Sequence, residues 1–222
     1  RLNRILAIKL LRRDDPELLE RFLREAQAQA QVEHENVCRV YEVGQVEGQP
    51  YIAMQLVAGR SLREMGAELN LEQKVLVIRQ VALAAHAAHR TGLVHRDLKP
   101  ANILLERQED GGWHPWVVDF GLAHSVSGQG LTSPGAVVGT AAYMAPAQAR
   151  GSVAHLDRRT DVYGLGATLY ELLTGRPPFQ AEHDVQLLML VVNEDPIPPR
   201  RHDPGIPADL ETIVLKCLEK EP

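Results

Sequence analysis

The sequence predicts an α+β protein with two lobes, a small strand-rich part over residues 1–57 and a larger, mainly helical part over residues 58–222. Two patterns support this division. Short apolar runs separated by turn residues dominate the first part, whereas long stretches with apolar residues at helical spacing dominate the second. The chain has 222 residues, of which 45% are hydrophobic, so it is long enough to bury a sizeable core.

The first part is expected to hold three strands and one helix. Residues 4–11 are rich in Ile and Leu and are predicted to form a strand. A helix is expected to begin after Asp15, a favourable N-cap residue, and to continue to about Val32. Two further strands are predicted at Val37–Gln45 and Tyr51–Val57. The glycine and proline between them favour a hairpin turn.

The second part opens with a long predicted helix. Asn70 and Gln73 form a capping-box pattern, and the helical spacing continues until Gly92. Residues 93–121 are expected to form short strands and loops, and residues 122–159 show little periodicity. A stretch of that length without regular structure is often functional. Three more helices are expected, over residues 160–174, 182–193 and 208–220.

Composition and charge exclude several classes of function. A net charge of −5 and the lack of a basic stripe argue against nucleic acid as a partner. Cys38 and Cys217 lie far apart without metal-ligand spacing, which favours a reducing, cytoplasmic location. The apolar run 187–192 is too short to cross a bilayer, so no membrane segment is expected. The sequence begins in the middle of a strand-like alternation and ends as abruptly after Glu221-Pro222. We therefore expect a longer protein, with possible flanking sensor or repeat domains.

Two polar clusters bear the chemistry. The segment His95–Asn102 follows the helix stop at Gly92, and Asp119-Phe120-Gly121 follows a short apolar strand. Phosphoryl transfer needs oxygen ligands for Mg²⁺, a carboxylate that orients the attacking hydroxyl, and a cation for the developing charge. Asn102 and Asp119 offer the oxygens, Asp97 the carboxylate and Lys99 the cation. The residues are therefore suited to phosphoryl transfer.

These clusters form part of an ordered set that resembles the eukaryotic-type protein kinase domain. The set consists of Ala7-Ile8-Lys9, His95–Asn102, Asp119-Phe120-Gly121, and Gly139-Thr140 followed by Ala145-Pro146. Lys99-Pro100 resembles the serine/threonine branch, and Tyr163–Pro178 resembles its bacterial members. The resemblance covers nearly the whole chain. It implies a bilobal fold, a small partial β-sheet lobe with one helix and a larger α-helical lobe, which transfers the γ-phosphate of ATP to a protein Ser or Thr hydroxyl.

The resemblance also implies roles for particular residues. Asp97 is expected to be the catalytic base, with Lys99 beside it. Lys9 is expected to bind the α- and β-phosphates and to pair with Glu25 in the first helix. The expected Mg²⁺ ligands are Asn102 and Asp119.

Other positions are expected to bind the adenine ring. Met54 resembles the residue at the back of the adenine pocket. The backbone of Gln55 and Val57 is expected to hydrogen-bond the base, and Ala7 and Leu104 are expected to sandwich it.

Regulation and support are implied at a further group of positions. Arg96 resembles the class activated by loop phosphorylation, with Thr132 or Ser133 as the expected phosphate acceptor. Thr140 is expected to line the seat of the substrate hydroxyl. Asp161 is expected to be a buried acid that braces the catalytic loop.

Three departures from the family pattern lead to a rival hypothesis. The glycine-rich loop over the phosphates would precede residue 1, Ala147 stands where the family has a glutamate, and Gln29 takes a usually apolar position. The chain itself is therefore expected to have weak activity or none, whereas the longer protein is expected to be active. The alternative is a pseudokinase or scaffold module. A small-molecule phosphotransferase is disfavoured, because Gly139-Thr140 and Ala145-Pro146 are typical of kinases that act on proteins.

Overall fold

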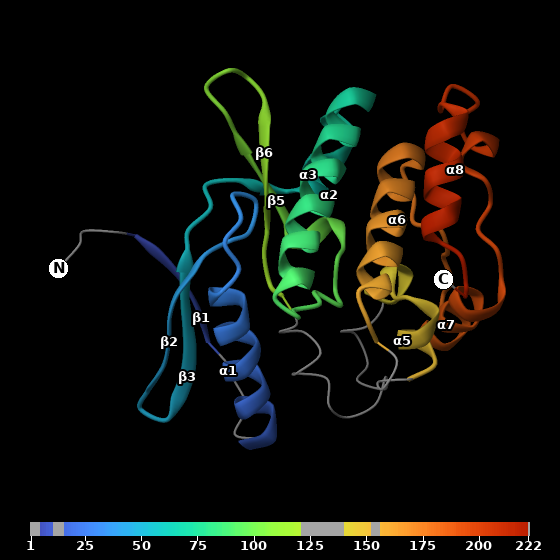
Figure 1. The fold of residues 1–222 in the computed structure, drawn as a ribbon. Helices are drawn as coiled ribbons and strands as arrows, with labels where there is room; N and C mark the ends of the chain where they lie inside the picture. The colour runs from blue at the N-terminus through green and yellow to red at the C-terminus, as the bar shows by residue number, and fades with distance from the viewer. Residues whose placement is uncertain (1–4, 11–15, 121–139, 152–155, 222) are drawn as a thin grey trace.

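The computed structural model describes residues 5–10, 16–120, 140–151 and 156–221. A small sheet with one helix forms one side of the molecule, and a group of helices forms the other (Figure 1). Between them lies a β-hairpin formed by β5 and β6. This arrangement agrees with the bilobal α+β fold that the sequence predicts. The boundary between residues 57 and 58 stays a prediction.

The small sheet has three antiparallel strands in the order β1-β3-β2. Their bounds are β1 (Leu6–Leu10), β2 (Val40–Val46) and β3 (Gln49–Gln55). A two-residue turn joins β2 to β3, with positive φ angles of 51° at Glu47 and 80° at Gly48. Two consecutive positive φ angles match the right-handed twist of a hairpin. The predicted hairpin is thus confirmed, although its first strand begins at Val40 and not at Val37.

The helix α1 (Pro16–Ala30) packs against β2 and closes the interior of the small part. A compact cluster of buried side chains lies there, formed by Ala26, Cys38, Ile52 and Met54. Val32 and Val37, which follow the helix, instead belong to the larger core. The chain after α1 therefore leaves the small part and packs into the second part.

The second part contains a small sheet, helices and short 3₁₀ segments. Its sheet has the order β4-β5-β6, with the strands at β4 (Arg60–Ser61), β5 (Ile103–Arg107) and β6 (Trp113–Val117). Its α-helices are α2 (Leu62–Met65), α3 (Leu71–Arg90), α5 (Pro146–Ala149), α6 (Arg159–Thr174), α7 (Asp184–Asn193) and α8 (Ala208–Cys217). Its 3₁₀ segments are η1 (Gly66–Glu68), η2 (Pro100–Asn102), η3 (Ala141–Tyr143) and η5 (Pro199–Arg201). In Figure 1, α6 lies between α3 and α8, and it packs against both.

The ends of the long helices follow from the residues found there. Asn70 and Gln73 form both bonds of the predicted capping box at the start of α3, at 2.9 and 3.0 Å. Gly92 follows the helix with a φ of 82°, and Gly175 ends α6 with a φ of 74°. Glycine adopts such left-handed angles without a steric penalty. Gly92 follows α3 by two residues and ends the helical run, so the segment His95–Asn102 begins at a defined place.

A short parallel bridge joins the two parts. Val37 pairs with Val117, the backbone N–H of Cys38 donates to the Val117 carbonyl at 2.9 Å, and the Val117 N–H donates to the Asn36 carbonyl at 2.7 Å. Because β6 leads within two residues to Asp119, this bridge fixes the small part relative to the predicted metal ligand. None of the helices among the described residues is both long and apolar enough to span a bilayer.

The region 122–159 contains more regular structure than its composition predicts. Within the described residues 140–151, η3 and α5 form two short turns. Alanine and proline supply these turns without an amphipathic pattern, which explains why periodicity alone missed them. The predicted phosphate acceptors Thr132 and Ser133, with Gly121 and Gly139, lie outside the described residues.

Candidate active site

The loop after α3 is held in place by one buried carboxylate. Asp161, near the start of α6, is 1% exposed, and its two oxygens accept hydrogen bonds from the N–H groups of His95 at 2.8 Å and Arg96 at 2.7 Å. The Nε2 atom of His89 lies 2.7 Å from the same carboxylate. Arg96 has a φ of 65°, a left-handed conformation that a non-glycine residue rarely adopts. Asp161 thus braces the loop, as the sequence predicts.

Asp97 lies at the centre of the cluster that this loop presents. Its side chain is 5% exposed. The Nζ atom of Lys99 donates to its carboxylate, at 3.0 Å to Oδ1 and 2.8 Å to Oδ2. The amide of Asn102 donates to Asp97 Oδ2 at 2.9 Å and to the Asp97 carbonyl at 2.8 Å. These hydrogen bonds fix the orientation of the carboxylate. An oriented carboxylate of this kind can accept a hydrogen bond from a substrate hydroxyl.

Lys99 links Asp97 to a segment more than 40 positions further along the chain. Its Nζ atom also donates to Thr140 Oγ1 at 2.9 Å. The chain therefore brings the predicted base, the predicted cation and the predicted hydroxyl seat into a single hydrogen-bonded group. This group agrees with the positions that the resemblance implies for all three residues.

The two predicted metal ligands flank the β5–β6 hairpin: Asn102 directly precedes β5, and Asp119 lies two residues after the end of β6. The N–H of Val118, one residue before Asp119, donates to the Asn102 carbonyl at 3.1 Å. Because the Asn102 amide nitrogen is directed at Asp97, its Oδ1 atom is left for a ligand. Asp119 has a φ of 62°, which turns its carboxylate out of the strand direction.

These two oxygen donors fit Mg²⁺, which typically takes one or two protein ligands and completes its shell with water and phosphate oxygens. Within the part of the chain that the structure describes, no three His, Cys, Asp or Glu side chains gather into a denser metal site. A magnesium ion brought by a nucleotide therefore suits the donor set better than an all-protein metal cage.

Lys9 pairs with Asp119 across the two parts. Its Nζ atom lies 2.7 Å from Asp119 Oδ1, and the two side chains are 39% and 33% exposed. The sequence instead predicts Glu25 as the partner of Lys9. Glu25 lines a different cavity of about 280 Å³, between α1 and the catalytic loop, together with Arg96. The pairing of Lys9 in this structure thus differs from the prediction.

Two of the predicted adenine-binding residues, Ala7 and Val57, lie close to Met54. Ala7 pairs with Met54 in the β1–β3 register, and Ala7 and Val57 pack against its cluster. The sequence predicts that the backbone of Gln55 hydrogen-bonds the base. Its N–H is already engaged, because it donates to the Arg39 carbonyl at 2.8 Å. Its carbonyl accepts only a weak Cys38 Sγ–H contact at 3.5 Å and stays available to a base. Leu104 lies half-buried on β5, in the second part, and its place against the adenine ring stays a prediction.

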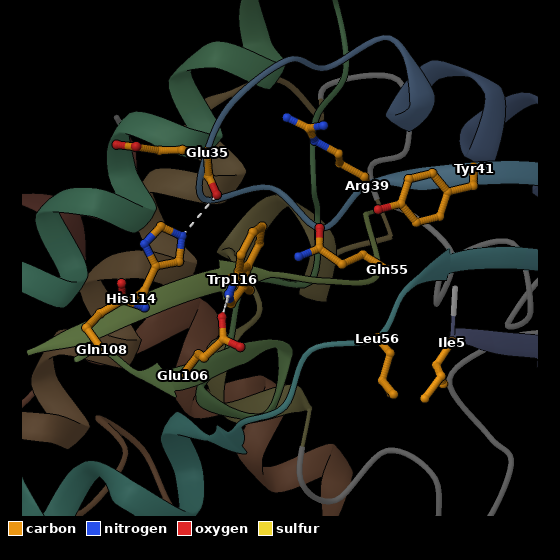
Figure 2. A pocket seen from close by; sticks show the side chains of 10 residues that line it. All are labelled: Ile5, Glu35, Arg39, Tyr41, Gln55, Leu56, Glu106, Gln108, His114 and Trp116. Atoms are coloured by element: carbon orange, nitrogen blue, oxygen red, sulfur yellow. Dashed lines mark hydrogen bonds between the residues drawn. The ribbon is translucent and has the colours of Figure 1, made fainter. Parts of the chain in front are cut away.

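A cavity of about 530 Å³ lies beside Gln55, the last residue of β3 (Figure 2). The side chain of Gln55 lines it together with Leu56, Trp116 and Arg39. The Trp116 indole donates to Glu106 at 2.9 Å, which the dashed line in Figure 2 marks. Because neither Lys9, Asp97 nor Asp119 lines this cavity, it is separate from the predicted phosphate site.

His95 has a structural role in the site. It is fully buried, accepts the Asp97 N–H on Nδ1 at 3.2 Å, and donates from Nε2 to the Val118 carbonyl at 2.9 Å. These two contacts select the neutral Nε2–H tautomer. The ring also stacks on Phe120, with centroids 4.6 Å apart. These contacts hold His95 as a packed side chain that supports the loop.

Sequence reasoning missed two supporting residues. His89, in the last turn of α3, contacts Asp161, although no motif includes it. Gln148 in α5 donates to the Arg96 carbonyl at 2.8 Å and accepts the Ala145 N–H at 2.9 Å. A histidine in the last turn of a helix directly before a catalytic loop is a signal that could have found His89. Nothing in the local pattern indicates Gln148, because its partner lies more than 50 residues away.

The two-part fold, with an oriented carboxylate, a lysine beside it and two oxygen donors for magnesium, defines the class of nucleotide-dependent phosphotransferases. The family profile described as "Protein kinase domain" matches residues 1–222. The chain therefore belongs to the protein kinase family.

Relatives and solved structures agree with this assignment. The chain is 41% identical over its full length to serine/threonine-protein kinase PknB of Mycobacterium tuberculosis and to a probable serine/threonine-protein kinase of Streptomyces coelicolor. It spans only 36% and 34% of their lengths. The crystal structure of the Mycobacterium tuberculosis PknI kinase domain matches with a TM-score of 0.74 at 28% identity, covering 98% of this chain and 78% of that one.

Proposed function

We propose that this chain is a serine/threonine protein kinase domain that transfers the γ-phosphate of ATP to a protein Ser or Thr hydroxyl. The single observation that supports the transfer step is the hydrogen-bonded group of Asp97, Lys99 and Thr140. It combines a carboxylate to orient the hydroxyl, a cation to stabilise developing charge and a hydroxyl at the substrate seat. Its residue types and distances match the needs of phosphoryl transfer.

The other residues of the site have supporting roles in this proposal. Lys9 would bind phosphate oxygens of ATP. Glu25 on α1 would form an ion pair with Lys9 after Lys9 separates from Asp119. Asn102 and Asp119 would hold Mg²⁺, which supplies positive charge at the phosphates when bound. Met54, the Gln55 carbonyl, Val57, Ala7 and Leu104 would receive the adenine ring.

Regulation and location complete the proposal. Phosphorylation of Thr132 or Ser133 would activate the domain, since a phosphate there could form charge-assisted bonds to Arg96 beside the catalytic carboxylate. We propose a cytoplasmic location for the domain, with further domains in the longer protein. The two free thiols, Cys38 and Cys217, fit a reducing compartment.

One observation favours a second candidate, a nucleotide-binding or scaffold module without turnover. The direct contact between Lys9 and Asp119 engages the proposed phosphate cation with the proposed metal ligand. Binding of ATP with Mg²⁺ has to separate this pair or insert between its members. Because both side chains are partly exposed, the contact is a weak barrier, and we favour the active kinase.

Phosphate transfer to a protein carrying exposed Ser and Thr residues tests the proposal. With labelled ATP and Mg²⁺, the longer protein, which is the form expected to be active, should label the substrate protein, and Asp97→Asn in it should reduce the rate by at least about a hundredfold. Thermal shift with ATP should require Mg²⁺ and should disappear in Asp119→Asn. A Mg²⁺-dependent shift without any transfer would instead support the scaffold, and the absence of both would contradict a nucleotide site.

A further inference from the structure

A cavity of about 430 Å³ lies beside the catalytic loop. Segments that are far apart in the sequence form it: α2, the first turn of α3, the end of α6, and Pro100 directly after Lys99. Three cations line it: Arg63 in α2, Lys74 in α3, and Arg176, which follows the end of α6 by two residues. The catalytic residues described above do not use this group of charges.

The three cations are available to a ligand. No ion pair within 4.0 Å is found for any of their side chains across the described residues. Arg63 and Arg176 are exposed, and Lys74 is half-buried. Arg63 lies close enough to Tyr143 to lower the pKa of that phenol, partly offsetting the larger rise that burial and Glu171 cause. Its guanidinium group thus lies near the segment that follows Thr140.

The acids that line the same cavity are already engaged. Glu171 accepts a short hydrogen bond from the hydroxyl of Tyr143, and Asp203 accepts the Gly205 N–H at 2.8 Å. His202 donates from Nε2 to Tyr170, whose hydroxyl donates onward to a carbonyl. Three positive and two negative side chains therefore line the cavity, in a chain whose net charge is −5. The local charge is opposite in sign to that of the protein.

The cavity lies within reach of the substrate hydroxyl. Pro100 on its wall is three residues from Asp97, and three residues span at most about 11 Å. From the other side, Tyr143 is three residues from Thr140 and binds Glu171 on the cavity wall. A peptide whose hydroxyl rests between Asp97 and Thr140 can thus place a side chain a few residues away into this cavity.

We propose that this cavity, formed around Arg63, Lys74 and Arg176, receives acidic side chains of the protein substrate close to the phosphorylated residue. The proposal rests on the proposed kinase function and adds a substrate class to it, namely Ser or Thr flanked by Asp or Glu. Charge complementarity of this kind selects partners more than it adds affinity. Paired acids would be favoured over single ones, because three cations converge there.

Binding of two fluorescent peptides to the full chain tests the proposal separately from phosphate transfer. Both peptides hold one Thr, with Glu at the three positions on each side in one peptide and Gln in the other. The wild-type chain should bind the Glu peptide about tenfold more tightly at low salt, and high salt should reduce the preference. Neutralising one cation, as in Arg63→Gln or Lys74→Gln, should reduce the preference about two- to fivefold.

A matched control removes an arginine elsewhere on the same helix. Arg79 is exposed on α3 and does not line the cavity, so Arg79→Gln should keep the wild-type preference. Equal binding of the two peptides, or an undiminished preference in the triple variant Arg63→Gln, Lys74→Gln, Arg176→Gln, would overturn the proposal. Phosphate transfer is measured in parallel. Selective binding without transfer would refute the kinase function alone, and transfer without selectivity would refute only the acidic substrate class.

Discussion

The side chain of Gln29 donates a hydrogen bond of 3.0 Å to the carbonyl oxygen of Cys38. Gln29 is 2% exposed and lies one helical turn after Glu25 on α1. Cys38 in turn bonds to Val117 through its N–H and to the Gln55 carbonyl through its thiol. One buried amide therefore connects the helix that carries Glu25 to the strand before Asp119 and to the predicted adenine-binding segment.

Replacing Gln29 by methionine should loosen this connection. Gln29→Met keeps the volume of the side chain but leaves the buried Cys38 carbonyl without its donor, which costs about 1–3 kcal/mol. The melting temperature should fall by several degrees, and the KM for ATP should rise severalfold, because α1 is held less firmly relative to Lys9. Differential scanning fluorimetry and initial rates at varied ATP measure the two effects.

The neighbouring residue Gln27 offers a matched control. It is exposed on the same helix, so Gln27→Met makes the same chemical change without removing a buried bond. It should leave both the melting temperature and the KM for ATP at wild-type values. The KM for ATP is measured at a temperature well below the melting temperature. If Gln29→Met lowers the melting temperature but leaves this KM unchanged, Gln29 has only a structural role.

The carboxylate of Asp161 accepts three hydrogen bonds, so even a minimal substitution there should lower the stability of the protein. Asp161→Asn replaces one accepting oxygen by an NH₂ group, which must then face a donor from His89, His95 or Arg96. We expect a loss of about 2–4 kcal/mol in the free energy of unfolding, because buried donors lose a charged acceptor. Urea unfolding measures this loss, and phosphate transfer should fall with it.

His89→Gln is the companion variant for this site. The amide nitrogen of glutamine can replace the Nε2 donor of His89, so the carboxylate keeps its partners. Its effect on stability should be smaller than that of Asp161→Asn. An equal loss in the two variants would show that the imidazole packing, and not the hydrogen bond, supports the loop.

Local sequence patterns predicted the features that depend on a few neighbouring residues. The capping box at Asn70, the helix stop at Gly92 and the turn at Gly48 arise from backbone geometry within one or two turns. The cluster around Asp97 was also foreseeable, because its motif residues lie within one short loop. Each of these depends on contacts at small sequence separation.

Other features could not be inferred in this way. Whether Lys9 meets Glu25 or Asp119 depends on how α1 sits against the hairpin β5–β6, and both carboxylates suit a lysine equally well. For Gln29 the sequence shows only a polar residue at a usually apolar position, and it does not show that the carbonyl nine residues later lies beside it. The three cations of the substrate cavity come from separate elements, so only the folded chain brings them together.

The close approach of α6 to the catalytic loop depends on a glycine. A Cβ atom at Gly164 would lie 2.8 Å from the carbonyl oxygen of Leu98, between Asp97 and Lys99. Gly164→Ala should push this loop away and lower kcat about tenfold or more, because small displacements of reacting groups slow transfer. Steady-state kinetics with saturating ATP and peptide measure the effect.

Gly166 provides the comparison for this effect within the same helix. A Cβ atom there would lie 2.5 Å from the Cβ atom of Cys217 in α8, away from the catalytic loop. Gly166→Ala should lower the melting temperature. Its kcat, measured at a temperature well below the melting temperature, should stay near the wild-type value. If both variants lose kcat equally, overall destabilisation explains the loss and the close approach at Leu98 does not.

The ammonium group of Lys220 predicts a particular pH dependence of stability. It donates to the Val191 carbonyl at 2.7 Å and lies 4.3 Å from the ring centre of Phe179, and burial lowers its pKa from 10.5 to about 8. Below pH 8 the lysine is charged in both the folded and unfolded states, so the folded state carries the full cost of burying the charge. Between about pH 8 and 10.5 the unfolded chain binds more protons, so this residue makes stability rise with pH.

Comparing the wild-type chain with Lys220→Met isolates this contribution from other titrating groups. The difference in melting temperature, wild type minus variant, should increase as the pH rises from about 7.5 to about 9.5, whatever its starting value. A constant offset is expected from the lost hydrogen bond and ring contact, and it does not depend on pH. Parallel curves for the two proteins would therefore mean that the lysine keeps its ordinary pKa and that its charge is fully solvated in the folded chain.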